Sequence, residues 1–270
     1  MTASNENHPQ TQPGGESHAD QAVAVPAGKA AFDARIGLVC NRWVMLAAAL
    51  AAGTCIGAIL HFGHPFFRGP TVPPPINHDP VAGGHTPMHA TLRRVEYQNA
   101  AAVYGLFGAA VSAALALAEG TARKSAVYAG AGMASGIVFG GGLGIVGGLV
   151  AQCIAFQPTP GLDEMAKTIL MRGPSWAVAG MGIGLGFTLP SRCWRTIAMG
   201  TGNLVLGGLL SALVFGPAVA VVLPRVQTEL VVPPASADRV AWLVATAGLM
   251  GLLAGRRGRQ HPGVPKAASG

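Results

Sequence analysis

The stretch GMASGIVFGGGLGIVGG, residues 132–148, carries a glycine at every fourth position. The glycines of this row, called the glycine row below, are Gly132, Gly136, Gly140, Gly144 and Gly148, and no charged residue interrupts them. In a water-exposed helix each glycine costs roughly 0.5–1 kcal/mol relative to alanine. In a lipid bilayer the backbone must satisfy its own hydrogen bonds, so glycine-rich segments stay helical. The row therefore indicates a membrane-spanning helix with a flat packing surface.

The charged residues outline further spans. They make up 11% of the 270 residues, against about 25% in soluble domains. A transmembrane helix needs about 20 mostly apolar residues, and six intervals between charged residues reach or nearly reach that length. The sequence predicts an all-α, polytopic transmembrane bundle within residues 43–255, with about six spans. We place the spans at 43–61, 97–118, 126–155, 174–190, 196–223 and 240–255, the sixth being the shortest.

The segments outside the predicted spans differ in composition. Residues 1–42 are rich in polar residues, Pro and Gly, which predicts a disordered arm. Residues 62–96 form a Pro- and His-rich outer loop, and residues 256–270 form a basic tail. Within the second outer loop, residues 161–173 fit a short interfacial helix or a helical lead-in to the fourth span.

The distribution of basic residues predicts the orientation. The net charge is +7, but the Lys and Arg residues sit mostly in pairs beside the spans rather than in a nucleic-acid-binding patch. With the N-terminus inside, 11 of the 18 Lys and Arg residues lie on the cytoplasmic side. Cytoplasmic loops carry the excess of positive charge in membrane proteins. We therefore expect a multi-pass protein of the cell membrane with both termini in the cytoplasm and no nucleic-acid partner.

Small residues at every fourth position recur in the other spans, and such stripes let helix backbones approach closely. The interpretation we favour is tight packing inside one bundle; the alternatives are a seam between subunits of a homo-oligomer, or a flexible or pore-lining helix. Residues 113–132 also resemble residues 183–202, each with a tight basic turn followed by Gly-x-Gly. This pattern predicts a parallel repeat of a two-helix hairpin.

The predicted spans contain no charged residue in their interiors. Transporters and intramembrane enzymes usually carry ionisable residues there, so no catalytic residue is assigned. Asn203 is the most notable polar residue, and we expect it to bridge helices. The hypothesis we favour is a non-enzymatic structural or assembly-forming bundle. The first alternative is a channel or facilitator for a small solute.

The second alternative is a metal-handling protein. Five of the eight histidines lie between residues 61 and 89. Neutral imidazole is a common ligand of transition metals, so Zn²⁺ or Cu²⁺ is the cofactor this loop could hold. The spacing of these histidines matches no specific metal-binding motif. Two histidines three or four positions apart would need a helix to face the same metal, and the prolines of the loop disfavour a helix. The candidate ligands are His61, His64, His78, His85 and His89.

Overall fold

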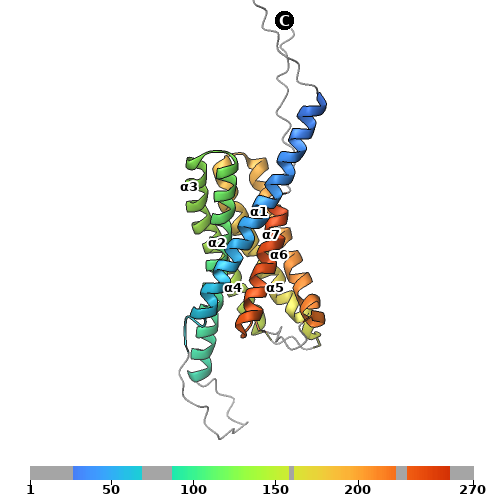
Figure 1. Ribbon diagram of the computed structural model, residues 1–270. Coiled ribbons are helices and arrows are strands. Elements are labelled where there is room, and N and C mark those ends of the chain that lie inside the picture. Colours follow the sequence, from blue (N-terminus) through green and yellow to red (C-terminus); the bar gives the residue numbers. More distant parts are fainter. Residues whose placement is uncertain (1–26, 69–86, 158–160, 223–229, 256–270) are drawn as a thin grey trace, which may run out of the picture. The chain divides into compact units, whose positions relative to one another are not determined.

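The computed structural model describes residues 27–68, 87–157, 161–222 and 230–255. Every regular element in these ranges is a helix. The chain divides after Ile36 into two units, and the helix bundle belongs to the second. Figure 1 labels the α-helices. The elements are α1 (Ala27–Gly63), α2 (Pro87–Ala122), α3 (Ala126–Ser135), η1 (Gly136–Gly140), α4 (Gly141–Ala155), α5 (Glu164–Thr188), η2 (Leu189–Ser191), α6 (Trp194–Val222) and α7 (Ser236–Ala254).

The predicted membrane bundle is confirmed. Within the described residues, five helical stretches are long and apolar enough to cross a membrane. The third of them joins α3, η1 and α4 and has the predicted bounds, 126–155. The sixth predicted span, the shortest, is also among them. The five stretches are 42–63, 90–122, 126–155, 194–215 and 236–254.

The fourth predicted span corresponds to α5, which is not one of the five apolar stretches. This helix lies at the centre of the bundle, against α2, α3, η1, α4 and α6. Between Met171 and Thr188, Pro174 and Met181 are its exposed residues. A helix enclosed by other helices contacts little lipid, so its own residues need not be uniformly apolar.

The boundaries of three predicted segments are wrong. The last part of the predicted arm 1–42 is helical, since α1 begins at Ala27. The predicted loop 62–96 ends early, because α2 begins at Pro87, a residue that favours the first helical turn. The fourth span starts at Glu164 and continues through Pro174, so the helical lead-in is correct and the interfacial helix is not. Residues 1–26, 69–86 and 256–270 of the predicted arm, loop and tail lie outside the described residues.

The glycine row packs against a matching row on α2. A Cβ atom on Gly132 would lie 2.8 Å from the Ala116 Cβ, and one on Gly136 would lie 2.8 Å from the Ser112 Oγ. Further along, the row faces backbone rather than side chains, and a Cβ on Gly148 would lie 2.5 Å from the Ala100 carbonyl oxygen. All five glycines are buried. Their partners are Ala116, Ser112, Gly108, Tyr104 and Ala100.

The partners of successive glycines in the row are therefore also four residues apart on α2, and they run in the opposite direction along the chain. An α-helix has 3.6 residues per turn, so such a row drifts around the helix by about 40° at each step. The five residues Gly136–Gly140 form a π-helical turn, which holds more residues per turn and reduces this drift. The π turn thus keeps both ends of the row facing α2.

The hairpin of α5 and α6 repeats this arrangement. Cβ atoms on Gly180 and Gly208 would meet the carbonyl groups of Leu204 and Trp176 across the hairpin. The contacts are symmetric about Arg192, just as the glycine row and its partners are symmetric about Lys124. Both residues have φ of 52° and both N–H groups bond the carbonyl three residues earlier.

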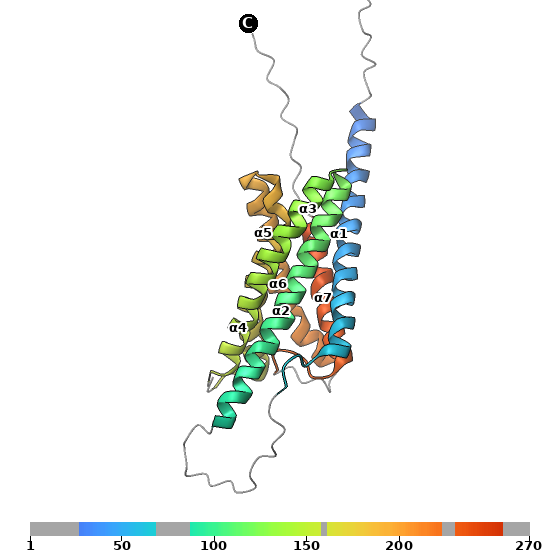
Figure 2. The same ribbon diagram turned by 90° about the vertical axis from the view of Figure 1, so that its left-hand side faces the viewer.

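The two hairpin turns lie at the same end of the bundle, as Figure 2 shows. The Tyr128 hydroxyl on α3 donates a hydrogen bond to the Phe187 carbonyl on α5 at 3.4 Å. Farther along the same pair of helices, the Ser135 hydroxyl donates to the Gly186 carbonyl at 2.6 Å. We call this end the turn end, and the end at residues 64–68, 156–157, 161–163 and 230–235 the loop end. Two hairpins with their turns on one side are the geometry of a parallel repeat.

Candidate functional site

An aromatic core fills the bundle toward the loop end. Tyr104 of α2 stacks on Trp176 of α5, with ring centroids 4.6 Å apart. Trp176 meets Trp242 of α7 edge to face at 5.2 Å, and Phe107 packs against Trp176 at 5.0 Å. These four side chains have no exposed surface. Each such aromatic pair adds about 0.5–1.5 kcal/mol beyond the burial of its area.

Arg172 lies inside this core, fully buried on α5. Its guanidinium group sits 4.8 Å from the Phe215 ring centroid and 5.5 Å from that of Trp242. Its Nη2 also donates a hydrogen bond to the Leu230 carbonyl at 3.1 Å. Arg172 lies two residues before the predicted span 174–190, which itself contains no charged residue. The helix that contains this span begins ten residues before Pro174, at Glu164, so Arg172 is a residue of the helical lead-in.

A second arginine binds the segment that contains Leu230. Arg239, near the start of α7, is buried and donates from Nη1 to the Pro233 carbonyl at 3.2 Å. The same nitrogen lies 2.5 Å from the His64 Nδ1. Arg172 and Arg239 together fix residues 230–233, in which Val231 and Pro233 are buried. We call these four residues the cap segment, because the two arginines hold it over the loop end of the core.

The partner of Arg239, His64, is half-buried. Burial, and secondly the positive charge of Arg239, lower the pKa of His64 to about 4. At neutral pH the imidazole is therefore uncharged, and its Nδ1 can accept the arginine N–H. The nearby Asn99 fixes the same loop, because its amide bonds both backbone groups of Phe67: it accepts from the N–H at 3.0 Å and donates to the carbonyl at 2.9 Å.

The described histidines do not form a metal site. The guanidinium of Arg239 next to His64 disfavours a dication there, and the exposed His61 packs edge to face on Phe62. His89 lies in the first turn of α2, and His78 and His85 lie outside the described residues. Among the side chains that the structure describes, no group of three or more His, Cys, Asp or Glu could hold a metal. Zn²⁺ or Cu²⁺ binding by the full loop stays a prediction.

The predicted bridging role of Asn203 falls to another residue of α6. Asn203 is only half-buried, whereas Ser211 is fully enclosed and its hydroxyl lies 2.6 Å from the Thr246 hydroxyl of α7. Ser211 and Thr246 carry short hydroxyl side chains, and the sequence alone does not show whether such side chains are buried or exposed. The α6–α7 contact therefore uses a hydroxyl pair rather than an amide.

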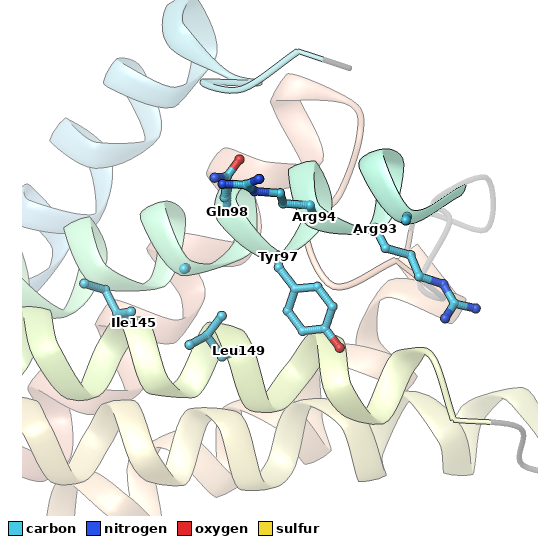
Figure 3. A pocket seen from close by; sticks show the side chains of 8 residues that line it. Arg93, Arg94, Tyr97, Gln98, Ile145 and Leu149 are labelled. Carbon is cyan, nitrogen blue, oxygen red and sulfur yellow. The ribbon is translucent and has the colours of Figure 1, made fainter. Parts of the chain in front are cut away.

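A groove runs between α2 and α4 on the outer surface of the bundle. Near the loop end it has a volume of about 690 Å³ and is lined from α2 by Arg93, Arg94, Tyr97 and Gln98. Figure 3 shows Tyr97 pointing from α2 toward α4, and Ile145 and Leu149 facing it from α4. An apolar hollow of about 570 Å³ adjoins it and shares Ala101 and Ile145. We call the two together the α2–α4 groove.

Comparison with known proteins gives no relative. No family model, no curated protein and no solved structure matches this chain. The features that bear on function are the aromatic core, the cap segment and the α2–α4 groove.

Proposed function

We propose that this chain is a non-enzymatic, multi-pass membrane protein with a structural role, a rigid bundle that presents fixed surfaces to the bilayer and to other proteins. The observation that carries the proposal is how the interior is filled. Along the glycine row, from Gly132 near the turn end to Gly148 near the loop end, α2 and the α3–η1–α4 helix pack so closely that no Cβ atom fits between them. Toward the loop end, aromatic rings with no exposed surface occupy the centre.

The buried charges support the same reading. A transport site needs polar or charged groups that face a cavity or a water-filled path. Arg172 instead stacks on aromatic rings and bonds a carbonyl of the cap segment. Arg239 bonds another carbonyl of that segment and the imidazole of His64. Both arginines thus serve to close the loop end.

A facilitator for a small solute is the second candidate, and one observation favours it. The Tyr104 hydroxyl and the indole N–H groups of Trp176 and Trp242 are buried without a hydrogen-bond partner among the described residues. Leaving such a group unpaired costs about 1–3 kcal/mol. A small anion that entered the aromatic core could accept hydrogen bonds from these three groups and would be attracted by the positive charge of Arg172.

Cysteine accessibility separates the two candidates. Single cysteines replace Ser175, Ala179 and Ile183, which are buried along α5, in a chain lacking Cys40, Cys55 and Cys153. The native Cys193 is the internal positive control. It is exposed in the turn, and hydrogen bonds from the backbone and side chain of Thr196 lower its pKa, which favours the reactive thiolate. A packed bundle leaves the three α5 cysteines unlabelled by a charged maleimide. Labelling of all three would establish an aqueous path and contradict the proposal.

We further propose that the turn end faces the cytoplasm and that both termini lie on that side of the cell membrane. Two of the seven basic residues assigned to the outer side, Arg172 and Arg239, are buried and bound to carbonyl groups. The charge difference between the two exposed sides is therefore larger than the sequence count. Cys193 should react with an impermeant maleimide in inverted vesicles and not in intact cells. The reverse pattern would overturn the orientation.

If a homo-oligomer forms, the proposal places its contacts away from the glycine row. The row is buried against α2 of the same chain. The surfaces left for a partner are the exposed apolar faces of the spans, for example Ile137 and Val138 beside the row.

A further inference from the structure

The α2–α4 groove has a cationic end. Arg93 and Arg94 line it there, together with the polar side chains of Tyr97 and Gln98, and no carboxylate belongs to the lining. Arg94 is exposed and extends along α2 beside Gln98 (Figure 3). Arg93 is steadied by the Phe156 ring, 5.0 Å from its guanidinium carbon. Arg93 also interacts with the Glu96 carboxylate on the same helix, so the positive charge of this end comes mainly from Arg94.

The length of α2 places these arginines at the membrane surface. From Arg94 to Lys124 in the hairpin turn, the helix rises about 45 Å at 1.5 Å per residue. A bilayer with its headgroup layers is about 40–45 Å thick. When the basic turn at Lys124 lies in one headgroup layer, Arg93 and Arg94 lie in the other. Lipid phosphates surround them at that depth.

The rest of the groove is apolar and leads toward the bilayer centre. It continues past Ala101 and Gly105 to Ala109 on α2, where the small side chains leave the hollow open. Ile137 and Ile145 form the opposite wall. From Arg94 to Ala109 the groove runs about 22 Å along the helix, more than the roughly 15 Å that is half of the hydrocarbon core. An acyl chain of one leaflet fits within it.

We propose that the α2–α4 groove binds one anionic phospholipid from the leaflet at the loop end. Arg94 and Gln98, whose side chains lie together in Figure 3, hold the phosphate, Arg93 adds positive charge at the same depth, and an acyl chain lies along Ala101, Gly105 and Ala109. Charge and shape both favour this occupant. A guanidinium group can donate two parallel hydrogen bonds to phosphate oxygens. The small side chains of α2 leave a hollow in which an acyl chain can lie.

Native mass spectrometry of the full-length protein in detergent tests this site. The protein is titrated with phosphatidylglycerol or with phosphatidylcholine carrying the same acyl chains. We expect one phosphatidylglycerol per chain to bind at least tenfold more tightly than phosphatidylcholine. The R93Q/R94Q variant should lose that preference. K124Q/R195Q is the matched control, because it removes two exposed charges at the turn end, and it should keep the preference.

A second variant tests the apolar part of the groove. Ala101 belongs to both hollows, so A101W should block the acyl chain while leaving both arginines in place. We expect at least tenfold weaker binding of phosphatidylglycerol at an unchanged melting temperature. Water-soluble glycerol phosphate should not compete with the lipid in the unaltered protein.

Several results would overturn the proposal. These are equal binding of the two lipids, full binding by R93Q/R94Q or by A101W, and equal losses in K124Q/R195Q. Competition by glycerol phosphate would show that the site recognises the headgroup alone and that the acyl chain does not contribute to binding. A dimer that A101W converts to monomers, with no lipid preference, would show that a second copy covers the groove instead.

Discussion

Gly140 of η1 and Gly108 of α2 meet backbone against backbone. A Cβ atom built on either residue would collide with the carbonyl group of the other. Backbone cannot move aside as a flexible side chain can, so this contact fixes the spacing of the two helices. Such close approach is how helices associate in lipid, where the hydrophobic effect does not drive them together.

Substitution at this contact should disrupt the bundle. We expect G140L to destabilise the protein by about 3 kcal/mol, the upper part of the usual range for overpacking, because the added side chain meets backbone and forces the helices apart. The measurement is thermal unfolding in detergent. The control is G130L on α3, where a Cβ would meet nothing within 4 Å. Equal melting temperatures for G140L and the unaltered protein would show that the helices do not pack in this way.

The contact of His64 with Arg239 should make stability depend on pH. The pKa of His64 falls from 6.5 in the unfolded chain to about 4 in the folded protein. Between these values the unfolded chain binds the additional proton, so the contribution is complete above about pH 6.5 and is lost as the pH falls toward 4. We expect a loss on the order of 1–2 kcal/mol, since the side chain is only half-buried and solvent screens it.

The variant H64Q isolates this contribution. Glutamine keeps an acceptor for the Arg239 N–H and does not titrate, so its melting temperature should change less between pH 7 and pH 4. H61Q, at an exposed position three residues before His64, serves as the control and should keep the pH dependence of the unaltered protein. An H64Q profile identical to that of the unaltered protein would place the acid sensitivity elsewhere.

Arg172 should hold the cap segment in place. The variant R172M fills the same space but lacks the hydrogen bond to the Leu230 carbonyl. Replacing a buried charge by an apolar side chain can leave stability nearly unchanged, so the informative readout is local. We expect a cysteine at the buried Val231 to react several-fold faster in R172M. K167M, on the same helix and only partly buried, should leave that rate unchanged. Equal rates in the two variants would show that Arg172 does not hold the cap segment in place.

The amino-acid sequence was sufficient to predict the apolar spans and the glycine row. Both are local patterns: an uncharged run of sufficient length, and one residue type at a fixed spacing. The bounds 126–155 are predicted correctly because Lys124 and Asp163 enclose an uncharged run there. The π turn within it was not predicted, since nothing in GIVFG distinguishes a wide turn from an α-helical one.

The site residues were harder to predict because their partners are remote in sequence. Arg172 was assigned to the second outer loop, in the stretch 161–173 that fits a short helix, and no local pattern there shows that its side chain is buried against Phe215 and Trp242. His64 and Arg239 are 175 positions apart, and no local pattern pairs them. The α2–α4 groove did leave a signal. Arg94, Gln98, Ala101, Gly105 and Ala109 share one helical face, polar at its start and small beyond.

The central claim is that the glycine-faced helices pack within one chain, and a disulfide tests it most directly. A Cβ on Gly141 would lie 3.5 Å from the Ala109 Cβ, within the range of Cβ separations found in disulfides. In membranes of a chain without its native cysteines, G141C/A109C should oxidise to a bond within one monomer. G141C/A113C, one turn out of register, should not. A bond between two chains, or equal oxidation of both pairs, would contradict the account.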